Sequence, residues 1–203
     1  MKRVLDILLS LLALLVLGLP MLLVAMAVRL DSRGPALFRQ RRAGWRGRPF
    51  TMLKFRTMRL DSDPYGDSPH GADDARLTRT GKFLRRWSLD ELPQLLNVLA
   101  GQMSLVGPRP LYERQAAGWT DRQRRRLDVR PGLTGYAQTR GRGELTIEDK
   151  IELDLYYVEH QSVWFDIKIL SRTLGVLGRS SEIYEHRYSR DKQRESDEKR
   201  SNQ

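Results

Sequence analysis

The sequence feature that most constrains this chain is an uncharged run near the N-terminus. The 22 residues from Ile7 to Val28 carry no charge, and Ser10 is the one clearly polar side chain among them. As a straight helix the run would be about 33 Å long, enough to cross the hydrocarbon core of a bilayer. It is apolar on every side, so we expect a helix that contacts a membrane rather than one that covers a soluble core.

The flanks of this run and one proline inside it bear on its topology. Lys2 and Arg3 precede it, and several arginines follow it from residue 29 onward. Positive charge at both ends predicts that both ends lie in the cytoplasm. Pro20 is expected to break the helix, and a kinked, re-entrant membrane helix over residues 1–30 satisfies both observations. Two alternatives stay open: a straight spanning helix with its N-terminus outside, and a signal peptide cleaved near residue 27.

Composition indicates the chemistry of the partner. The chain holds 36 Lys and Arg against 25 Asp and Glu, a net charge of +11, and residues 29–59 alone carry +9. Such a surplus predicts an anionic partner, phosphate above all. There are no cysteines and three histidines, which excludes disulfides, thiolate nucleophiles and cysteine-ligated metals and disfavours a histidine site. A catalytic site must be built from carboxylates, arginines, lysines and hydroxyls.

The remaining pattern predicts an α+β fold, a helix-rich single domain with a small β-hairpin. Residues 37–39 and 50–55 have strand character and flank a glycine-rich turn, while residues 92–99, 148–160 and 166–177 have apolar side chains at helical spacing. Residues 61–74 are acidic and rich in Pro and Gly, which predicts a loop. We therefore divide the chain into residues 1–30, a domain over 31–184 that includes interfacial helices, and a polar charged tail over 185–203.

The most informative segment for chemistry is residues 88–94, where Asp90 and Glu91 are adjacent and Arg85 lies shortly before them. Ser88 and Glu91 have the spacing of a capping box, and the position of Pro93 makes Asp90 the expected N-cap of the following helix. Capping alone is therefore one interpretation. The other is functional, since paired carboxylates near arginines can hold a divalent cation and a phosphate together.

Arginines next to rigid or permissive backbone are the second signal. Arg109 lies between two prolines, Arg130 precedes a Pro-Gly pair, and Arg142 lies between two glycines. The guanidinium fork matches phosphate oxygens. The chain lacks the glycine-rich nucleotide-binding loops and the zinc-protease motif, so these arginines suggest a phosphate site without a nucleotide-binding fold.

Four motifs, in this order and spacing, resemble those of the bacterial sugar transferase family, the monotopic phosphoglycosyl transferases that use polyprenol phosphates. They are Lys54-Phe55-Arg56-Thr57-Met58, Ser88-Leu89-Asp90-Glu91-Leu92-Pro93-Gln94, Ser104-Leu105-Val106-Gly107-Pro108-Arg109-Pro110 and Arg130-Pro131-Gly132-Leu133-Thr134-Gly135. The resemblance covers residues 1–180 and is highly specific.

The resemblance implies transfer of a phosphosugar from a UDP-sugar to polyprenol phosphate, undecaprenyl phosphate in bacteria, with release of UMP. It implies that Asp90 is the nucleophile that forms a covalent phosphosugar intermediate and that Glu91 is its partner carboxylate at a Mg²⁺ site. Arg85, Arg109 and Arg142 match positions around the phosphates and nucleotide, and Lys54 and Arg56 lie in a matching substrate-binding motif. The implied location is the cytoplasmic face of the bacterial inner membrane, in contact with lipid and without a nucleic-acid partner; a homodimer stays open.

A function of another class stays open as well. The arginines at 122, 124, 125 and 126 could belong to a membrane-tethered basic module that binds nucleic acid or anionic lipid without catalysis. This run contains no aromatic residues, which base stacking would favour, and a run of charge is most often a solvated face. Release of UMP from a UDP-sugar in the presence of Mg²⁺ distinguishes the two functions.

Overall fold

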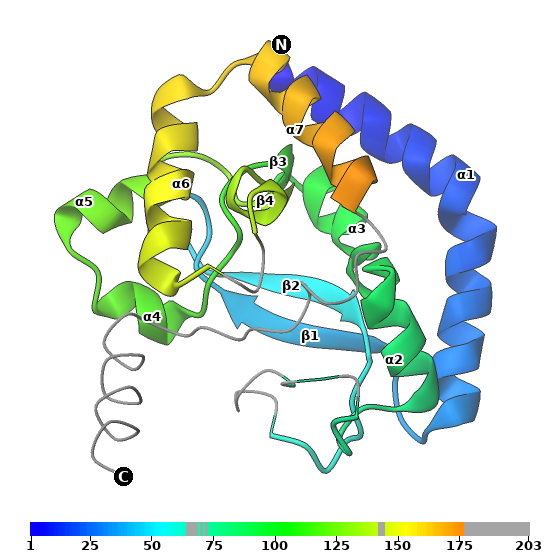
Figure 1. Cartoon of the computed structure of the whole chain (residues 1–203). Coiled ribbons are helices and arrows are strands. Elements are labelled where there is room, and N and C mark those ends of the chain that lie inside the picture. Colours follow the sequence, from blue (N-terminus) through cyan, green and yellow to red (C-terminus); the bar gives the residue numbers. More distant parts are fainter. Residues whose placement is uncertain (64–68, 70, 72, 142–144, 177–203) are drawn as a thin grey trace, which may run out of the picture.

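The computed structural model describes residues 1–63, 69, 71, 73–141 and 145–176, and its fold is of the predicted α+β class (Figure 1). The α-helices are α1 (Lys2–Asp31), α2 (Arg79–Arg86), α3 (Gln94–Leu99), α4 (Glu113–Ala117), α5 (Asp121–Arg124), α6 (Ile147–His160) and α7 (Val163–Val176). The strands are β1 (Leu37–Arg42), β2 (Phe50–Phe55), β3 (Ser104–Val106) and β4 (Gly132–Thr134). Short 3₁₀ turns are η1 (Trp45–Gly47), η2 (Leu89–Glu91), η3 (Arg125–Leu127) and η4 (Ala137–Thr139).

The predicted β-hairpin is confirmed. Strands β1 and β2 are antiparallel, with Leu37 opposite Phe55 and Arg42 opposite Phe50. Alternation along β2 directs Phe50 and Met52 into the main core, where they join apolar side chains of α3 and β3. Lys54 is the next residue on that face. The one charged side chain of β2 therefore lies near the C-terminal end of the strand.

Helix α1 runs along one side of the molecule, with α7 beside its N-terminal part and α3 and α2 along the rest (Figure 1). It is apolar and long enough to cross a membrane. The predicted break at Pro20 is wrong, because the helix is continuous through that residue and changes direction along its length without folding into a hairpin. A proline removes a single backbone hydrogen bond from a helix. Because both ends of this helix are also bonded to the rest of the protein, the helix continues through Pro20.

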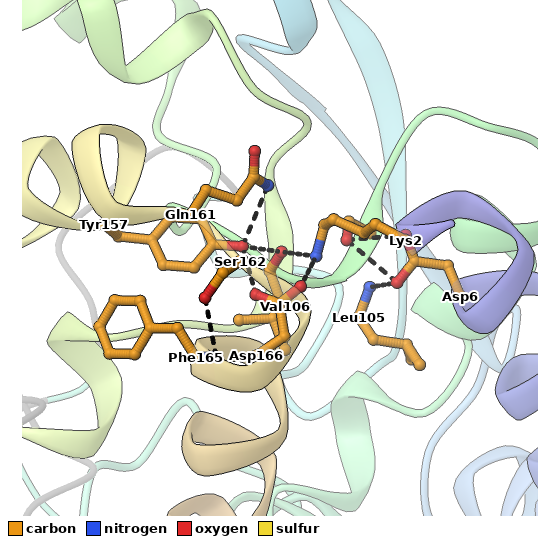
Figure 2. A network of polar contacts seen from close by, with 10 residues as sticks. Lys2, Asp6, Leu105, Val106, Tyr157, Gln161, Ser162, Phe165 and Asp166 are labelled. Atoms are coloured by element: carbon orange, nitrogen blue, oxygen red, sulfur yellow. Dashed lines mark hydrogen bonds and ion pairs between the residues drawn. The ribbon is translucent and has the colours of Figure 1, made fainter.

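The N-terminal end of α1 is bonded through its charged side chains, as Figure 2 shows for Lys2 and Asp6. The Lys2 ammonium donates to the Val106 carbonyl at 3.0 Å and to the Asp166 carboxylate at 2.5 Å. The buried Asp6 carboxylate accepts the Leu105 N–H at 3.0 Å. Strand β3 pairs with β4 on one edge, so these side chains satisfy polar groups of β3 that β4 leaves unpaired.

Other contacts complete this attachment. The Arg3 guanidinium donates to the Val98 carbonyl at 2.7 Å and to the Leu99 carbonyl at 3.1 Å, both in the last turn of α3. The hydroxyl of Tyr157, which is fully buried in α6, lies 2.6 Å from Asp166 Oδ1 and 3.1 Å from the Val106 carbonyl oxygen, the two acceptors of its one proton. The first turns of α1 are therefore fixed to α3, β3 and α7 by charged and buried polar groups.

The C-terminal end of α1 is bonded by Arg56, the residue that follows β2. Its buried guanidinium donates to the Ser32 hydroxyl at 2.6 Å, the Ser32 carbonyl at 2.8 Å and the Pro35 carbonyl at 2.8 Å. These carbonyls include groups that a helix end leaves without partners. In addition, the Asp31 carboxylate accepts the Thr80 N–H at the start of α2 at 2.8 Å. Both ends of α1 therefore attach to the same globular domain.

Strands β3 and β4 are parallel and bring two glycine motifs into contact. A Cβ on Gly132 would lie 2.1 Å from the Gly107 nitrogen, and a Cβ on Gly107 would lie 2.4 Å from the Arg130 carbonyl oxygen. Side chains at either position would separate the two strands. The glycines thus allow the segment that carries Arg109 to pack directly on the segment after Arg130.

The arginine run at 122–126 faces α6 rather than solvent alone. Three of its members form ion pairs with carboxylates of that helix. The pairs are Arg122 with Glu152, Arg125 with Glu159 and Arg126 with Asp154. Arg124 donates to the carbonyls of residues 117 and 119. The expectation of a solvated face is therefore wrong for Arg126, which is buried, and internal contacts already engage the charge that a nucleic-acid or lipid module would need.

Candidate active site

Three charged side chains from separate parts of the chain meet at one point. The Glu91 carboxylate accepts from the Lys54 ammonium of β2 at 2.8 Å and from Arg109 Nη2 at 2.8 Å. Arg109 Nη1 lies 3.4 Å from the second oxygen of Glu91, so the guanidinium faces the carboxylate with both of its terminal nitrogens. The structure thus brings together three of the residues that the sequence predicted.

The backbone before Asp90 has an uncommon conformation. Ser88 has a φ of 55° in the left-handed region, and η2 follows it directly. A non-glycine residue in this region carries strain of about 1–3 kcal/mol, and such residues cluster at functional sites. The turn presents Asp90 and Glu91 next to each other before α3 begins, and Arg85 lies near the end of α2 just ahead of it.

The predicted capping roles of this segment are wrong. Ser88 is the N-cap of η2 but makes no side-chain cap hydrogen bond, and the N-cap of α3 is Pro93 rather than Asp90. The sequence favours Asp90 because a proline fits best in the first helical turn, yet a 3₁₀ turn over residues 89–91 shifts the α-helix by several residues. The Asp90 carboxylate is therefore not used to cap a helix.

Asp90 is a buried carboxylate with charged neighbours. The residue is 9% exposed, and within the described part of the chain it makes no side-chain hydrogen bond or salt bridge. Burial raises its pKa, and the nearby negative charge of Glu91 adds to the rise, while Lys54, Arg85 and Arg109 favour the ionised form. A carboxylate held this way is available to a substrate, because no protein donor has to be displaced first.

Glu91 has the opposite electrostatic state. Burial alone would raise its pKa, but the adjacent charges of Arg109 and Lys54 outweigh it and hold the pKa well below its usual range. Burial lowers the pKa of Lys54, and Glu91 partly restores it. Neighbouring carboxylates whose pKa values move apart are typical of sites where the two groups have different tasks.

The comparisons with known proteins agree with these motifs. A family model described as bacterial sugar transferase matches residues 1–180. The chain belongs to the bacterial sugar transferase family. It is therefore a transferase enzyme, as the sequence predicted.

Relatives of this sugar transferase include three proteins with 44–46% identity. The sugar transferase EpsL of Bacillus subtilis is 44% identical over 86% of this chain and 85% of its own length. The undecaprenyl-phosphate glucose phosphotransferase of Komagataeibacter xylinus is 46% identical over 85% of this chain and 35% of its own length. The UDP-glucose:undecaprenyl-phosphate glucose-1-phosphate transferase of Caulobacter vibrioides is 44% identical over 90% of this chain and 72% of its own length.

The structure places the other predicted site residues of this sugar transferase in different ways. Arg85 is half-buried and acts on Asp90 through its charge, with no side-chain hydrogen bond among the described residues. Arg56 is not brought to Glu91, because β2 ends at Phe55 and the guanidinium that follows is bonded at the end of α1. Arg142 lies outside the described residues, as do half of the acidic segment over 61–74 and all of the tail over 185–203.

Arg42, the last residue of β1, is a charged neighbour of the site that was not predicted from the sequence. Its guanidinium stacks on the Tyr112 ring at 3.7 Å and donates to the Gln40 side chain at 2.5 Å. Burial lowers the pKa of Arg42 to about 10, and the charges of Arg109 and Glu91 also act on it. In the sequence Arg42 is one of many hairpin arginines, and only the register that pairs it with Phe50 distinguishes it.

The carboxylates at the site fit a Mg²⁺ ion that takes only one or two ligands from the protein. In the described ranges no cluster of three or more Asp, Glu or His side chains could enclose a metal. Mg²⁺ commonly binds through one or two carboxylates, with substrate phosphates and water supplying the other ligands. Asp90 offers an unbonded buried carboxylate for this purpose, and Glu91 offers the oxygen that Arg109 approaches only at 3.4 Å.

Proposed function

We propose that this enzyme transfers a sugar phosphate from a UDP-sugar, UDP-glucose in the first instance, to undecaprenyl phosphate, and that it initiates synthesis of a bacterial glycoconjugate or exopolysaccharide. The observation that carries the proposal is Asp90, a buried carboxylate without a protein donor, next to a Glu91 that is bound by two cations. The names of two relatives, the Komagataeibacter xylinus and Caulobacter vibrioides enzymes, supply the substrates. The covalent intermediate and the release of UMP are part of the same proposal, with Asp90 as the nucleophile.

In the first step the Asp90 carboxylate attacks the sugar-bearing phosphorus of the UDP-sugar. A bond forms between the Asp90 oxygen and phosphorus, and the bond from phosphorus to the bridging oxygen breaks, so UMP leaves with that oxygen and its electron pair. In the second step an oxygen of undecaprenyl phosphate attacks the same phosphorus, and the Asp90 carboxylate leaves. A carboxylate suits both steps because the acyl phosphate that it forms is reactive enough to be discharged.

The cations around Asp90 make this attack feasible. An anionic nucleophile and an anionic diphosphate repel each other, and positive charge at the site reduces that repulsion. In this proposal Arg109 and Arg85, whose charges act on Asp90, bind phosphate oxygens, while Lys54 holds Glu91. Asp90 and Glu91 are the residues that would hold Mg²⁺, and the ion would supply positive charge against the charge that develops on the transferred phosphate.

The attachment of α1 supports a location of the domain at one surface of the membrane, and the positive charge at both ends of the helix favours the cytoplasmic surface. Both ends of α1 are bonded to one globular domain, which favours entry and exit of the helix on the same face. Beside its N-terminal part, α7 exposes Trp164, which is 77% exposed, and Leu174. Exposed aromatic and aliphatic side chains on an amphipathic helix suit the membrane interface. The active site would then meet a soluble UDP-sugar and a lipid-borne phosphate in the same plane.

The proposed function is tested with purified enzyme, UDP-glucose, undecaprenyl phosphate and Mg²⁺. Without the lipid we expect about one UMP per enzyme, and with it we expect continuous release, because Asp90 must be discharged before it can react again. A chelator of divalent cations should stop the reaction. Release of UDP would contradict the proposal, since it would mean that the sugar–oxygen bond breaks; absence of UMP with any UDP-sugar would contradict it as well.

Arg109→Lys should reduce kcat/KM for UMP release although the charge is kept. Lysine can still pair with Glu91, but it cannot present two parallel donors to phosphate oxygens. Loss of one charge-assisted hydrogen bond corresponds to about a 10- to 100-fold lower rate. The matched control is Arg41→Lys, because Arg41 forms an exposed ion pair with Glu113. Equal kinetics in the two variants would show that only the charge of Arg109 matters.

A further inference from the structure

The loop that carries Arg109 is bonded residue by residue to other parts of the chain. The carbonyl of Pro108 accepts the Gly132 N–H at 2.9 Å, and the carbonyl of Leu111 accepts the Ala43 N–H at 3.0 Å. The carbonyl of Pro110 lies 3.4 Å from Arg42 Nη1. The carbonyl of Arg109 itself accepts from Arg126 Nη2 at 2.9 Å. Prolines at 108 and 110 have no N–H, so the loop depends on outside donors for its conformation.

The donor to the Arg109 carbonyl is a buried charge. Arg126 is 3% exposed and Asp154 of α6 is 1% exposed, and the two form an ion pair through Arg126 Nη2. The guanidinium also lies 4.9 Å from the centre of the Trp119 ring. Arg126 Nε and Asp154 Oδ1 have no hydrogen-bond partner among the residues that the structure describes, so the pair is not completely satisfied there.

An incompletely satisfied buried ion pair is weak support for stability, because desolvation of two charges offsets much of their attraction. The effect of the Arg126–Asp154 pair is instead to fix the positions of the groups that it contacts. A planar guanidinium bonded to Asp154 has a fixed direction, and its second contact fixes the carbonyl of Arg109. The side chain of Arg109 then extends from that residue to Glu91.

We propose that Arg126, with Asp154 as its counter-ion, is a positioning residue for Arg109. The inference rests on the proposed function, in which Arg109 binds substrate phosphate. Arg126 acts behind the site: it holds the backbone from which Arg109 reaches the phosphate, and Asp154 holds Arg126. Misplacement of a catalytic group by about 1 Å can cost about 100-fold in rate, so a tether of this kind has a large effect on kcat/KM.

The test removes the pair without leaving a lone buried charge. In Arg126→Met/Asp154→Leu both partners become apolar, a replacement that often leaves stability unchanged or higher. We expect its thermal midpoint to be retained while kcat/KM for UMP release falls by up to about 100-fold, with the same division between kcat and KM as in Arg109→Ala. Arg125→Met/Glu159→Leu is the matched control, since it removes an exposed pair between the same elements. It should keep its kinetics.

A double-mutant comparison separates positioning from a general structural role. In an Arg109→Ala background, removal of the Arg126–Asp154 pair should cost no more than about twofold, because the group that it positions is already gone. The same loss in both backgrounds, or no loss in either, would overturn the inference. Arg126→Lys, which keeps the buried charge opposite Asp154, takes the place of the double variant if the latter does not fold, with the same dependence on Arg109 expected.

Hydrogen exchange gives a readout independent of catalysis. The loop amides, at residues 107, 109, 111 and 112, should exchange faster in the double variant than in wild type, whereas those of α6 should not. Unchanged exchange at these four amides would overturn the inference whatever the rates. If wild type released no UMP, the proposed function would fail, and the exchange experiment would still decide whether Arg126 holds this loop.

Discussion

Asp90→Asn lowers UMP release by about 10⁴-fold or more and leaves no phosphosugar on the protein, because an amide cannot serve as the nucleophile. The fold should be retained or slightly stabilised, since Asp90 makes no hydrogen bond among the described residues and a neutral amide is cheaper to bury than a carboxylate. Mass spectrometry of enzyme quenched after mixing with UDP-glucose measures the adduct, which wild type should carry on Asp90.

The control for this experiment is Asp121→Asn, an exposed carboxylate in the first turn of α5. It should show normal turnover and a normal adduct. An adduct on another residue in wild type, or turnover in Asp90→Asn close to that of the control, would refute the assignment of the nucleophile.

The second large effect concerns the topology of α1. We expect a cysteine inserted between Met1 and Lys2 and the substitution Arg33→Cys to behave identically toward an impermeant thiol reagent. Both should be protected in intact spheroplasts and labelled after permeabilisation, as should Arg48→Cys at the turn of the hairpin. The physical reason is that the contacts of Lys2, Arg3 and Arg56 bind both ends of the helix to one domain. The native chain has no cysteine, so background labelling is absent.

Each alternative topology has its own result. A straight spanning helix would label the N-terminal cysteine alone in intact spheroplasts, and it would remove the Lys2 and Arg3 donors from the Val98, Val106 and Asp166 oxygens. A cleaved signal would appear as a chain that begins near residue 28. Either result would exclude entry and exit on one face.

The hairpin and the later helices could be predicted because their signals are local. Residues 50–52 alternate between core and surface, and β2 has the predicted bounds of 50–55. Helix α6 begins at Ile147 after an N-cap, Thr146, that accepts the Asp149 N–H. Helix α2 escaped prediction because its sequence is mostly polar and only Leu84 and Gly81 are buried. Strands β3 and β4 were not predicted, because three residues are too few to show an alternating pattern and because the two strands are distant in the sequence.

The residues of the site could be predicted from the sequence, but the contacts between them could not. Motif order identified Asp90, Glu91 and Arg109, yet the sequence does not show that Lys54 and Arg109 bind the same carboxylate. Lys54 and Arg56 share a strand face by spacing, but the strand ends between them and Arg56 turns to α1. Arg126 resembles its neighbours in the run, and its burial depends on Asp154, which lies on another helix.

The attachment of α1 at both ends also limits how this helix can evolve. One inserted residue would lengthen the helix by about 1.5 Å and rotate everything before it by about 100°. Lys2 and Asp6 would then turn away from β3, whereas Val28 and Ser32 would keep their hydrogen bonds with Arg56. Changes of side chain on the lipid-facing surface meet no such obstacle. Homologues should therefore adapt to bilayers of different thickness by exchanging apolar residues within a helix of constant length.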